Sequence, residues 1–189
     1  MIKTITDFDL LPEEDSNTPP HIIKPEIIHK SLLWTYFDGY AQEAGCGGGA
    51  ILYLNETHCF KIQMRLGRGT NNYAELCTTK HFMHFALEKH CRHLQLFGDS
   101  KIVCSWLNRS SHCNAYSLRN ILEEAHKLIA TFDSFAYRHI YKEKNLGADY
   151  LSKEAALRQS EDWLIREEVD GTFHQHYRKP FLELRENGL

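Results

Sequence analysis

The spacing of apolar residues changes from a strand-like to a helical period near residue 70, and this change limits the folds open to the chain. Before it, three segments rich in aromatic and other apolar residues follow one another at 31–37, 49–55 and 58–66. The last two are joined by the short turn Asn55-Glu56-Thr57. Consecutive strands with short connections usually pair side by side, so the sequence predicts an antiparallel meander.

After residue 70, helical segments alternate with two more strand-like segments. Ala74, Cys77, Phe82 and Phe85 recur at near-helical spacing in the first helix. The other expected elements are a strand at 93–98, helices at 101–108 and 117–132, a strand at 135–142, and a helix at 148–157. Strands separated by helices favour parallel pairing. The sequence therefore predicts an α/β fold: a five-stranded mixed sheet, with three antiparallel strands and then parallel strands, flanked by helices.

The chain has 189 residues, which suits one globular domain with some additional length. Residues 1–30 are rich in Pro and acidic residues and show no periodicity, so we expect a flexible N-terminal tail. Residues 31–158 hold all the expected strands and helices and form the predicted domain. Residues 159–189 mix aromatic and charged residues and form a C-terminal extension of unknown role.

Composition and charge narrow the class of protein. No apolar run approaches the roughly 18 residues that cross a bilayer, and the N-terminus lacks the order of a secretory signal. We therefore expect an intracellular protein with no membrane partner, in a compartment that the sequence does not specify. The six cysteines form no CxxC pair, which favours free buried thiols. The net charge of −3 provides no general attraction to nucleic acid, so such a partner needs a local basic surface or metal ions.

Four acidic residues stand at the ends of predicted elements or inside apolar segments. Asp38 follows an aromatic strand, Asp99 ends the fourth strand, and Glu75 and Asp149 lie in the first turns of two helices. In an open α/β sheet, functional groups gather at strand ends and neighbouring helix N-termini, so we expect these carboxylates to lie together. Taken singly, Glu75 or Asp149 is equally well explained as a helix cap, and Asp99 as a turn residue.

A cluster of carboxylates indicates a site for hard divalent cations. Like charges in a partly dry site repel one another, and a cation removes this repulsion. Mg²⁺ prefers oxygen ligands, which suits carboxylates better than a set of His and Cys. Two such ions about 3.5–4 Å apart activate a water molecule and stabilise the leaving oxygen in phosphodiester cleavage. We therefore expect Mg²⁺ as cofactor.

Another group of possible metal ligands crowds the end of the first helix. A closed zinc site needs four ligands that converge in a tetrahedron. Residues that span a helix and its exit point in several directions, so we do not predict a zinc site. The residues are His81, His84, His90, Cys91 and His93.

Four segments of the chain resemble, in order, the motif blocks of type 1 ribonuclease H, in its plant and retroelement branch. They are "FDGYAQEAGCGGGAILYL", "GTNNYAEL", "LFGDSKIVCSWL" and "HIYKEKNLGADYLSKEA", and the resemblance runs from Leu32 to Arg158. It implies the RNase H-like fold and makes residues 31–158 the catalytic domain. It also implies endonucleolytic cleavage of the RNA strand of RNA–DNA hybrids, leaving a 3′-hydroxyl and a 5′-phosphate, with Mg²⁺ or Mn²⁺ as cofactor.

The resemblance assigns catalytic roles to single residues. It makes Asp38, Glu75, Asp99 and Asp149 the catalytic metal ligands. His139 lies ten residues before Asp149, the spacing of a family histidine that helps protons and product to leave.

The resemblance also implies the contacts with substrate. Thr70 contacts a phosphate of the DNA strand, and Asn71 and Asn72 approach the RNA across the minor groove, with Gly39 and Asn145 completing the set. Amide side chains both donate and accept hydrogen bonds, as recognition of a 2′-hydroxyl requires. Helix capping explains the first three residues and loop ordering explains Asn145 equally well. The glycines at 45 and 47–49 would admit a sugar–phosphate chain closely or form a turn.

Two features depart from the family pattern. Tyr40 stands where the family often has a small residue, and it would crowd the metal site. The basic protrusion of some bacterial and animal members is missing between the segments "CSWLN" and "SLRNIL". With a net charge of −3, this absence predicts weak hybrid binding that falls steeply with salt. The candidates for a local basic surface are Arg65, Arg68, Lys101, Arg109 and Arg119.

Two alternative functions stay open at this point. One is a non-catalytic nucleic-acid-binding or assembly module, against which the four intact acids speak. The other is a different nuclease such as a junction resolvase, and "GTNNYAEL" favours hybrid cleavage over it. No Tyr-x-Asp-Asp polymerase signature is present, so the sequence does not decide between a standalone enzyme and part of a retroelement polyprotein. It predicts no particular protein partner.

Overall fold

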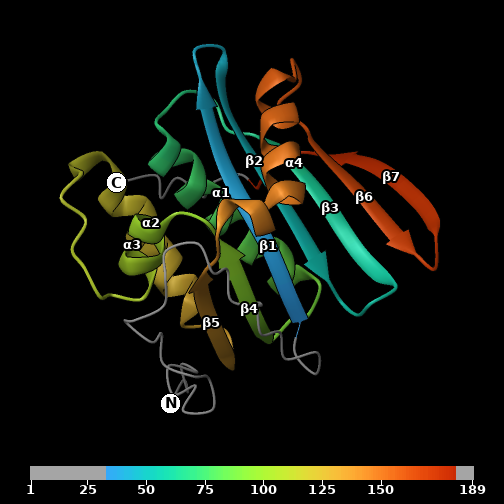
Figure 1. Cartoon of the computed structure of the whole chain (residues 1–189), viewed down its shortest axis with the longest axis horizontal. Coiled ribbons are helices and arrows are strands. Elements are labelled where there is room, and N and C mark those ends of the chain that lie inside the picture. Colours follow the sequence, from blue (N-terminus) through green and yellow to red (C-terminus); the bar gives the residue numbers. More distant parts are fainter. Residues whose placement is uncertain (1–32, 182–189) are drawn as a thin grey trace, which may run out of the picture.

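The computed structural model of the chain describes residues 33–181, and the predicted tail over residues 1–30 lies outside this range. Its centre is one sheet of seven strands in the order β5-β4-β1-β2-β3-β6-β7 (Figure 1). The strands are β1 (Leu33–Gln42), β2 (Gly45–Tyr53), β3 (His58–Arg65), β4 (His93–Gly98), β5 (Ser134–His139), β6 (Trp163–Val169) and β7 (Thr172–Arg178).

The first five strands pair as the sequence predicts. β1 pairs antiparallel with β2 and β2 with β3, which confirms the meander. β1 pairs in parallel with β4, and β4 with β5. Tyr36 lies opposite Phe97 in the β1–β4 register, so Asp38 and Asp99 follow at the same level, two residues further along. The topology therefore brings together two acids that are far apart in the sequence.

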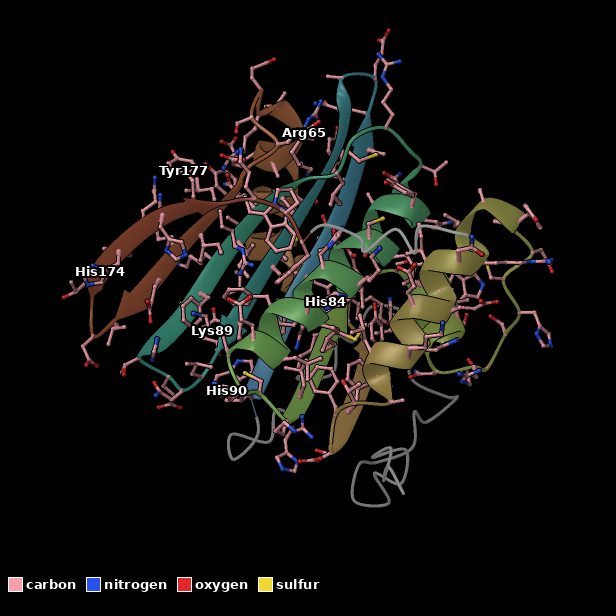
Figure 2. All side chains as sticks on the ribbon, turned by 180° about the vertical axis from the view of Figure 1, so that it is seen from behind. Arg65, His84, Lys89, His90, His174 and Tyr177 are labelled. Carbon is pink, nitrogen blue, oxygen red and sulfur yellow. The ribbon has the colours of Figure 1, made fainter. Side chains whose placement is uncertain are left out.

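Helices cover both faces of the sheet. α4 (Leu146–Leu157) crosses β1, β2 and β3 on one face (Figure 1), whereas α1 (Asn71–Glu88), with α3 (Arg119–Ile129) beside it, covers the other face (Figure 2). α2 (Lys101–Leu107) follows β4, and 3₁₀ turns at Tyr116–Leu118 and Lys142–Lys144 precede α3 and α4. All six cysteines are free and buried, as predicted. No helix in the described range is long and apolar enough to cross a membrane.

The prediction of a five-stranded sheet is wrong, because residues 163–178 add a hairpin to it. β6 pairs antiparallel with β3, and β7 pairs antiparallel with β6. Trp163 and Ile165 are buried in the core and alternate with more accessible neighbours. Asp170 and Gly171 join the two strands with φ values of 48° and 78°. Asp-Gly is the pair that favours such a two-residue turn, and it is the sequence signal for this hairpin.

The glycine run of β2 lets helices approach the sheet closely from both faces. A Cβ at Gly47 or Gly49 would overlap backbone atoms of α4, and a Cβ at Gly48 would overlap the hydroxyl of Thr78 on α1. These glycines are buried inside the strand. For Gly47, Gly48 and Gly49 the expectation of a turn or of contact with a sugar–phosphate chain is therefore wrong, because the neighbouring helices already occupy the space beside them. Gly45, with a φ of 134°, follows the turn at residues 43–44 and begins β2, as the strand-entry alternative predicts.

This packing predicts opposite effects for two Gly→Ala substitutions. Gly49→Ala would push a methyl group into the backbone of α4 at Ala148 and Ser152, so we expect a loss of roughly 3 kcal/mol in the free energy of unfolding. Gly147→Ala, in α4, meets only the flexible end of Ile51 at 2.9 Å. Because alanine favours a helix over glycine, this control should be neutral or stabilising by up to about 1 kcal/mol. Urea denaturation measures both, and equal effects would contradict the packing role.

Candidate active site

Three carboxylates converge where β1, β4 and α1 meet. One oxygen atom from each of Asp38, Glu75 and Asp99 lies within 4.8 Å of the other two. Asp38 comes from β1, Asp99 directly follows β4, and Glu75 lies near the start of α1. Asp38 and Glu75 are 6% and 5% exposed, and Asp99 is half-buried. The structure thus brings together three of the four acids that the sequence singles out.

Burial and like charges act on the Asp38 carboxyl in the same direction. Burial, followed by the charges of Asp99 and Asp149, raises the pKa of Asp38 to about 6. The hydroxyl of Ser152 on α4 donates a hydrogen bond to Asp38 Oδ2 at 2.5 Å and partly offsets this rise. The position favours the ionised form only when something compensates the negative charge around it.

Glu75 lies in an even less favourable position for a negative charge. Burial, together with the neighbouring Asp38 and Asp99, raises the pKa of Glu75 well above its usual range. The backbone N–H of Gly39 donates to this carboxylate and opposes the rise. Its Oε2 atom is buried and has no hydrogen-bond partner in the protein. A buried acceptor without a partner, beside two further carboxylates, fits a cation that accepts oxygen ligands.

Asp149 stands beside this cluster and is bound by two lysines. Lys153 Nζ lies 2.7 Å from Asp149 Oδ2, and Lys142 Nζ lies 3.4 Å from Oδ1. Burial raises the pKa of Asp149, but the two lysines outweigh burial and lower it overall. The Lys153 ammonium also lies 5.9 Å from the centre of the Tyr40 ring. The aromatic residue that departs from the family pattern thus contacts the lysine that binds Asp149.

The start of α1 carries the predicted substrate contacts. Thr70 is the N-cap of α1, and its hydroxyl accepts a hydrogen bond from the Tyr73 N–H at 3.2 Å. The Oδ1 atom of Asn71 accepts from the Ala41 N–H of β1 at 2.9 Å, which ties the helix start to the strand that carries Asp38. Thr70 and Asn71 are exposed and Asn72 is half-buried. Capping therefore accounts for part of their hydrogen bonding and leaves a polar surface accessible.

Three other predicted residues lie in different surroundings. Gly39 is buried against the backbone of α1 at Glu75, where any side chain would overlap the helix. Asn145 is 1% exposed, and its Nδ2 donates to the carbonyl oxygen of Phe37 at 2.9 Å. This bond fixes the start of α4 to β1, which is an ordering role. Because its side chain is buried, Asn145 offers no surface to a substrate. His139 ends β5, half-buried, and its ring lies 5.8 Å from that of Tyr141.

Sequence reasoning missed the residues that surround the acids. Ser152 and Lys153 follow Asp149 by three and four residues, which places them one helical turn further along α4. That spacing is the signal that would have identified them, because residues at i+3 and i+4 share a helix face. Lys142 lies in the 3₁₀ turn before α4, where no local pattern predicts its direction.

Several of the other candidate residues have partners of their own, whereas Arg68, Lys101 and Arg109 are exposed. Arg65 donates to the carbonyl oxygens of Ala156 and Ala44, so it connects the end of α4 to the β1–β2 turn and does not belong to a basic surface. Arg119 lies over the Tyr116 ring at 5.6 Å. The His and Cys residues near the end of α1 contact separate partners: His81 packs on Trp163, His84 on Phe181, and His93 bonds Ser134.

Comparison with known proteins identifies similar sequences and folds. The family model described as reverse transcriptase-like matches residues 36–155. A ribonuclease H1 from the halophilic archaeon Halobacterium salinarum is 27% identical, with a TM-score of 0.62, over 66% of this chain and 96% of that one. The N-terminal ribonuclease H domain of a Mycobacterium tuberculosis protein is 22% identical, with a TM-score of 0.60, over 66% and 93% of the two chains.

A third solved structure is a ribonuclease H1 isolated from compost, in complex with an RNA/DNA hybrid. It is 20% identical to this chain, with a TM-score of 0.55, over 66% of this chain and 96% of that one. A search of curated protein sequences gives no match. β6 and β7 lie beyond the residues that the family model matches.

The charge cluster predicts that Asp38→Asn stabilises the protein in the absence of divalent ions. The pKa of Asp38 is raised to about 6 from a usual value of 3.8, so its ionisation opposes folding. Stability should fall as pH rises between these two values and stay lower above pH 6, by at most about 3 kcal/mol. At pH 8 in EDTA we expect Asp38→Asn to unfold at a higher urea concentration than the wild type. Near pH 3, where the Asp38 carboxyl is protonated, the variant and the wild type should unfold at the same urea concentration.

An exposed carboxylate provides the control for this measurement. Asp133→Asn removes a charge that forms an ion pair with Arg92, at 3.5 Å and with both side chains more than half exposed. Its effect should be small at both pH values. A loss of stability for Asp38→Asn at pH 8 would contradict the like-charge account.

Proposed function

The chain belongs to the reverse transcriptase-like family of type 1 ribonuclease H domains, and on this basis we propose that it is an endonuclease that hydrolyses the RNA strand of RNA–DNA hybrids. The proposed products carry a 3′-hydroxyl and a 5′-phosphate. The proposed cofactor is Mg²⁺ or Mn²⁺, with two ions in the site when substrate is bound. The observation that carries the proposal is the convergence of the carboxylates of Asp38, Glu75 and Asp99, two of which are nearly buried.

The cluster is hard to explain as a stabilising feature of the fold. Three carboxylates within 4.8 Å of one another repel, and two of them are nearly buried. No lysine or arginine is bonded to Asp38 or Glu75 within the described range, whereas Asp149 beside them has two lysines. Unfavourable charge arrangements of this kind gather at functional sites. An arrangement of oxygen donors alone selects hard divalent cations over zinc.

The residues of the chain have distinct roles in this proposal. Asp38, Glu75 and Asp99 hold the cations, and Asp149 joins them once its bonds to Lys142 and Lys153 yield. Bound divalent cations supply an activated water molecule and stabilise the charge on the leaving oxygen. Burial and the neighbouring charges raise the pKa of both Asp38 and Glu75. Binding of the cations would displace any proton that either carboxyl holds, because ligands must be deprotonated. Ser152 and the Gly39 N–H orient Asp38 and Glu75.

Substrate recognition is proposed at the start of α1. Asn71 and Asn72 lie four and three residues before Glu75 on the same helix, so a strand that contacts them passes close to the acids. Amide side chains recognise the 2′-hydroxyl that distinguishes RNA from DNA. The exposed Thr70 offers its hydroxyl to a phosphate of the DNA strand. The proposal draws further support from the similar ribonuclease H1 structures, one of which contains an RNA/DNA hybrid.

A cleavage assay tests the proposed activity directly. Labelled RNA–DNA hybrid, RNA duplex, DNA duplex and single-stranded RNA are incubated with the full chain in Mg²⁺. We expect cutting only in the RNA strand of the hybrid, and none with EDTA. Asp38→Asn and Asp99→Asn should each lower the rate by several orders of magnitude, because each removes a ligand charge, while circular dichroism shows an intact fold.

The control variant is Asp162→Asn, which should leave the rate unchanged. Asp162 directly precedes β6 and is bonded to Lys179. Hybrid binding without any cleavage would favour a non-catalytic nucleic-acid-binding module. Cleavage of a branched DNA junction in preference to the hybrid would favour a junction resolvase.

A further inference from the structure

β7 forms an open edge of the sheet. Among residues 33–181 no strand pairs with its outer side. Six of its seven residues are exposed and the last is half-buried, whereas the other edge strand, β5, has four of six residues buried. In the described part of the chain no helix lies over β7, which forms the rim of the sheet (Figures 1 and 2). Within residues 33–181, the backbone N–H and C=O groups on its outer side are therefore unpaired.

This edge lacks the features that usually prevent a strand from pairing further. Natural edge strands carry inward-pointing charges, lysines, prolines or bulges, or they are very short. β7 has the sequence Thr-Phe-His-Gln-His-Tyr-Arg and pairs with β6 in an unbroken register over all seven residues. Phe173 and Tyr177 are 57% and 60% exposed. Figure 2 shows His174 and Tyr177 along this open rim.

The order of side chains in β7 is nearly symmetric about Gln175. His174 and His176 flank it, followed by the aromatic residues Phe173 and Tyr177. An antiparallel pair of two identical strands relates each residue to its mirror position along the strand. With Gln175 at the centre, Phe173 lies opposite Tyr177 of the second copy and His174 opposite His176 of the second copy. Each residue type therefore meets a similar type.

We propose that two copies of this chain pair through the outer edges of β7, antiparallel and about a two-fold axis at Gln175. The pairing satisfies the open backbone groups of both edges and closes the assembly at two chains, because β7 is the one largely exposed edge strand within residues 33–181. Cross-strand aromatic pairs are among the favourable contacts between strands, and this register provides two of them on one face.

The two faces of the proposed contact suit the surroundings of β7. Phe173, Gln175 and Tyr177 share one face, where Gln175 Nε2 lies 3.5 Å from the Tyr177 hydroxyl and Arg158 lies over the Tyr177 ring at 5.5 Å. Arg178 belongs to the other face and is bonded to Glu88 of α1 at 3.0 Å.

β2, β3 and β6 separate β7 from β1, which carries Asp38. The proposed contact therefore lies away from the acidic cluster in both copies, and the inference does not depend on the proposed activity.

Gln175 tests the register because it alone faces itself across the axis. Gln175→Lys places two lysines directly opposite each other, and Gln175→Glu places two glutamates opposite each other. Like charges at such positions repel, so we expect Gln175→Lys to raise the dissociation constant of the dimer about tenfold. Gln175→Glu should raise it less, because Arg166 Nη2 lies 3.3 Å from the Gln175 side-chain oxygen and offsets part of the negative charge. An equimolar mixture of the two variants pairs Lys with Glu and should recover the dimer. Sedimentation velocity of the full chain over a wide range of concentrations measures all three samples.

Asn120→Lys on α3 is the matched control, since it adds the same charge at an exposed position on the other side of the molecule. It should dimerise like the wild type, and circular dichroism should show the same fold for every variant. A wild-type chain that stays monomeric at all concentrations would overturn the proposal. So would a dimer that neither charge variant weakens, or a mixture that fails to recover it.

Discussion

The repulsion among Asp38, Glu75 and Asp99 is the interaction on which the rest of the site depends. Each acid is supplied by a different element, and the register of β1 with β4 and the packing of α1 force them together. The fold must supply the free energy that holds them there, because burial and like charge both favour separation or protonation. A bound cation would remove the repulsion among the three carboxylates, and the proposed function depends on such a cation.

Close packing of the helices makes this arrangement rigid. Gly39 lets the backbone of α1 lie directly on β1, so that Glu75 reaches Asp38, and Gly47 and Gly49 do the same for α4 on β2. α4 contributes Ser152 to Asp38, carries Asp149 in its first turn and carries Lys153 one turn later. A single helix thus supplies an acid, its counter-charge and a positioning hydroxyl. The glycines of β1 and β2 thus determine where the functional side chains of α1 and α4 lie.

Most of the strands and helices, and the meeting of Asp38 with Asp99, can be predicted from the sequence, because they depend on local patterns and on the order of the elements. Hydrophobic periodicity predicts the strands and helices, and parallel pairing of β1 with β4 predicts that Asp38 meets Asp99. The parts that sequence reasoning missed depend on tertiary contacts. The direction of Lys142, the burial of Asn145 and the use of the glycine run all require the packed helices. The hairpin of β6 and β7 is different, because Asp170-Gly171 was a readable signal between two alternating segments.

The most direct test of the central claim is the position of a bound divalent ion. Crystals grown with Mn²⁺ would be measured at a wavelength where manganese scatters anomalously. The account predicts an anomalous peak about 2.1 Å from oxygen atoms of Asp38, Glu75 and Asp99, with all three carboxylates turned toward it. A peak elsewhere with none among these acids, or an ordered cluster whose carboxylates point apart, would contradict the account.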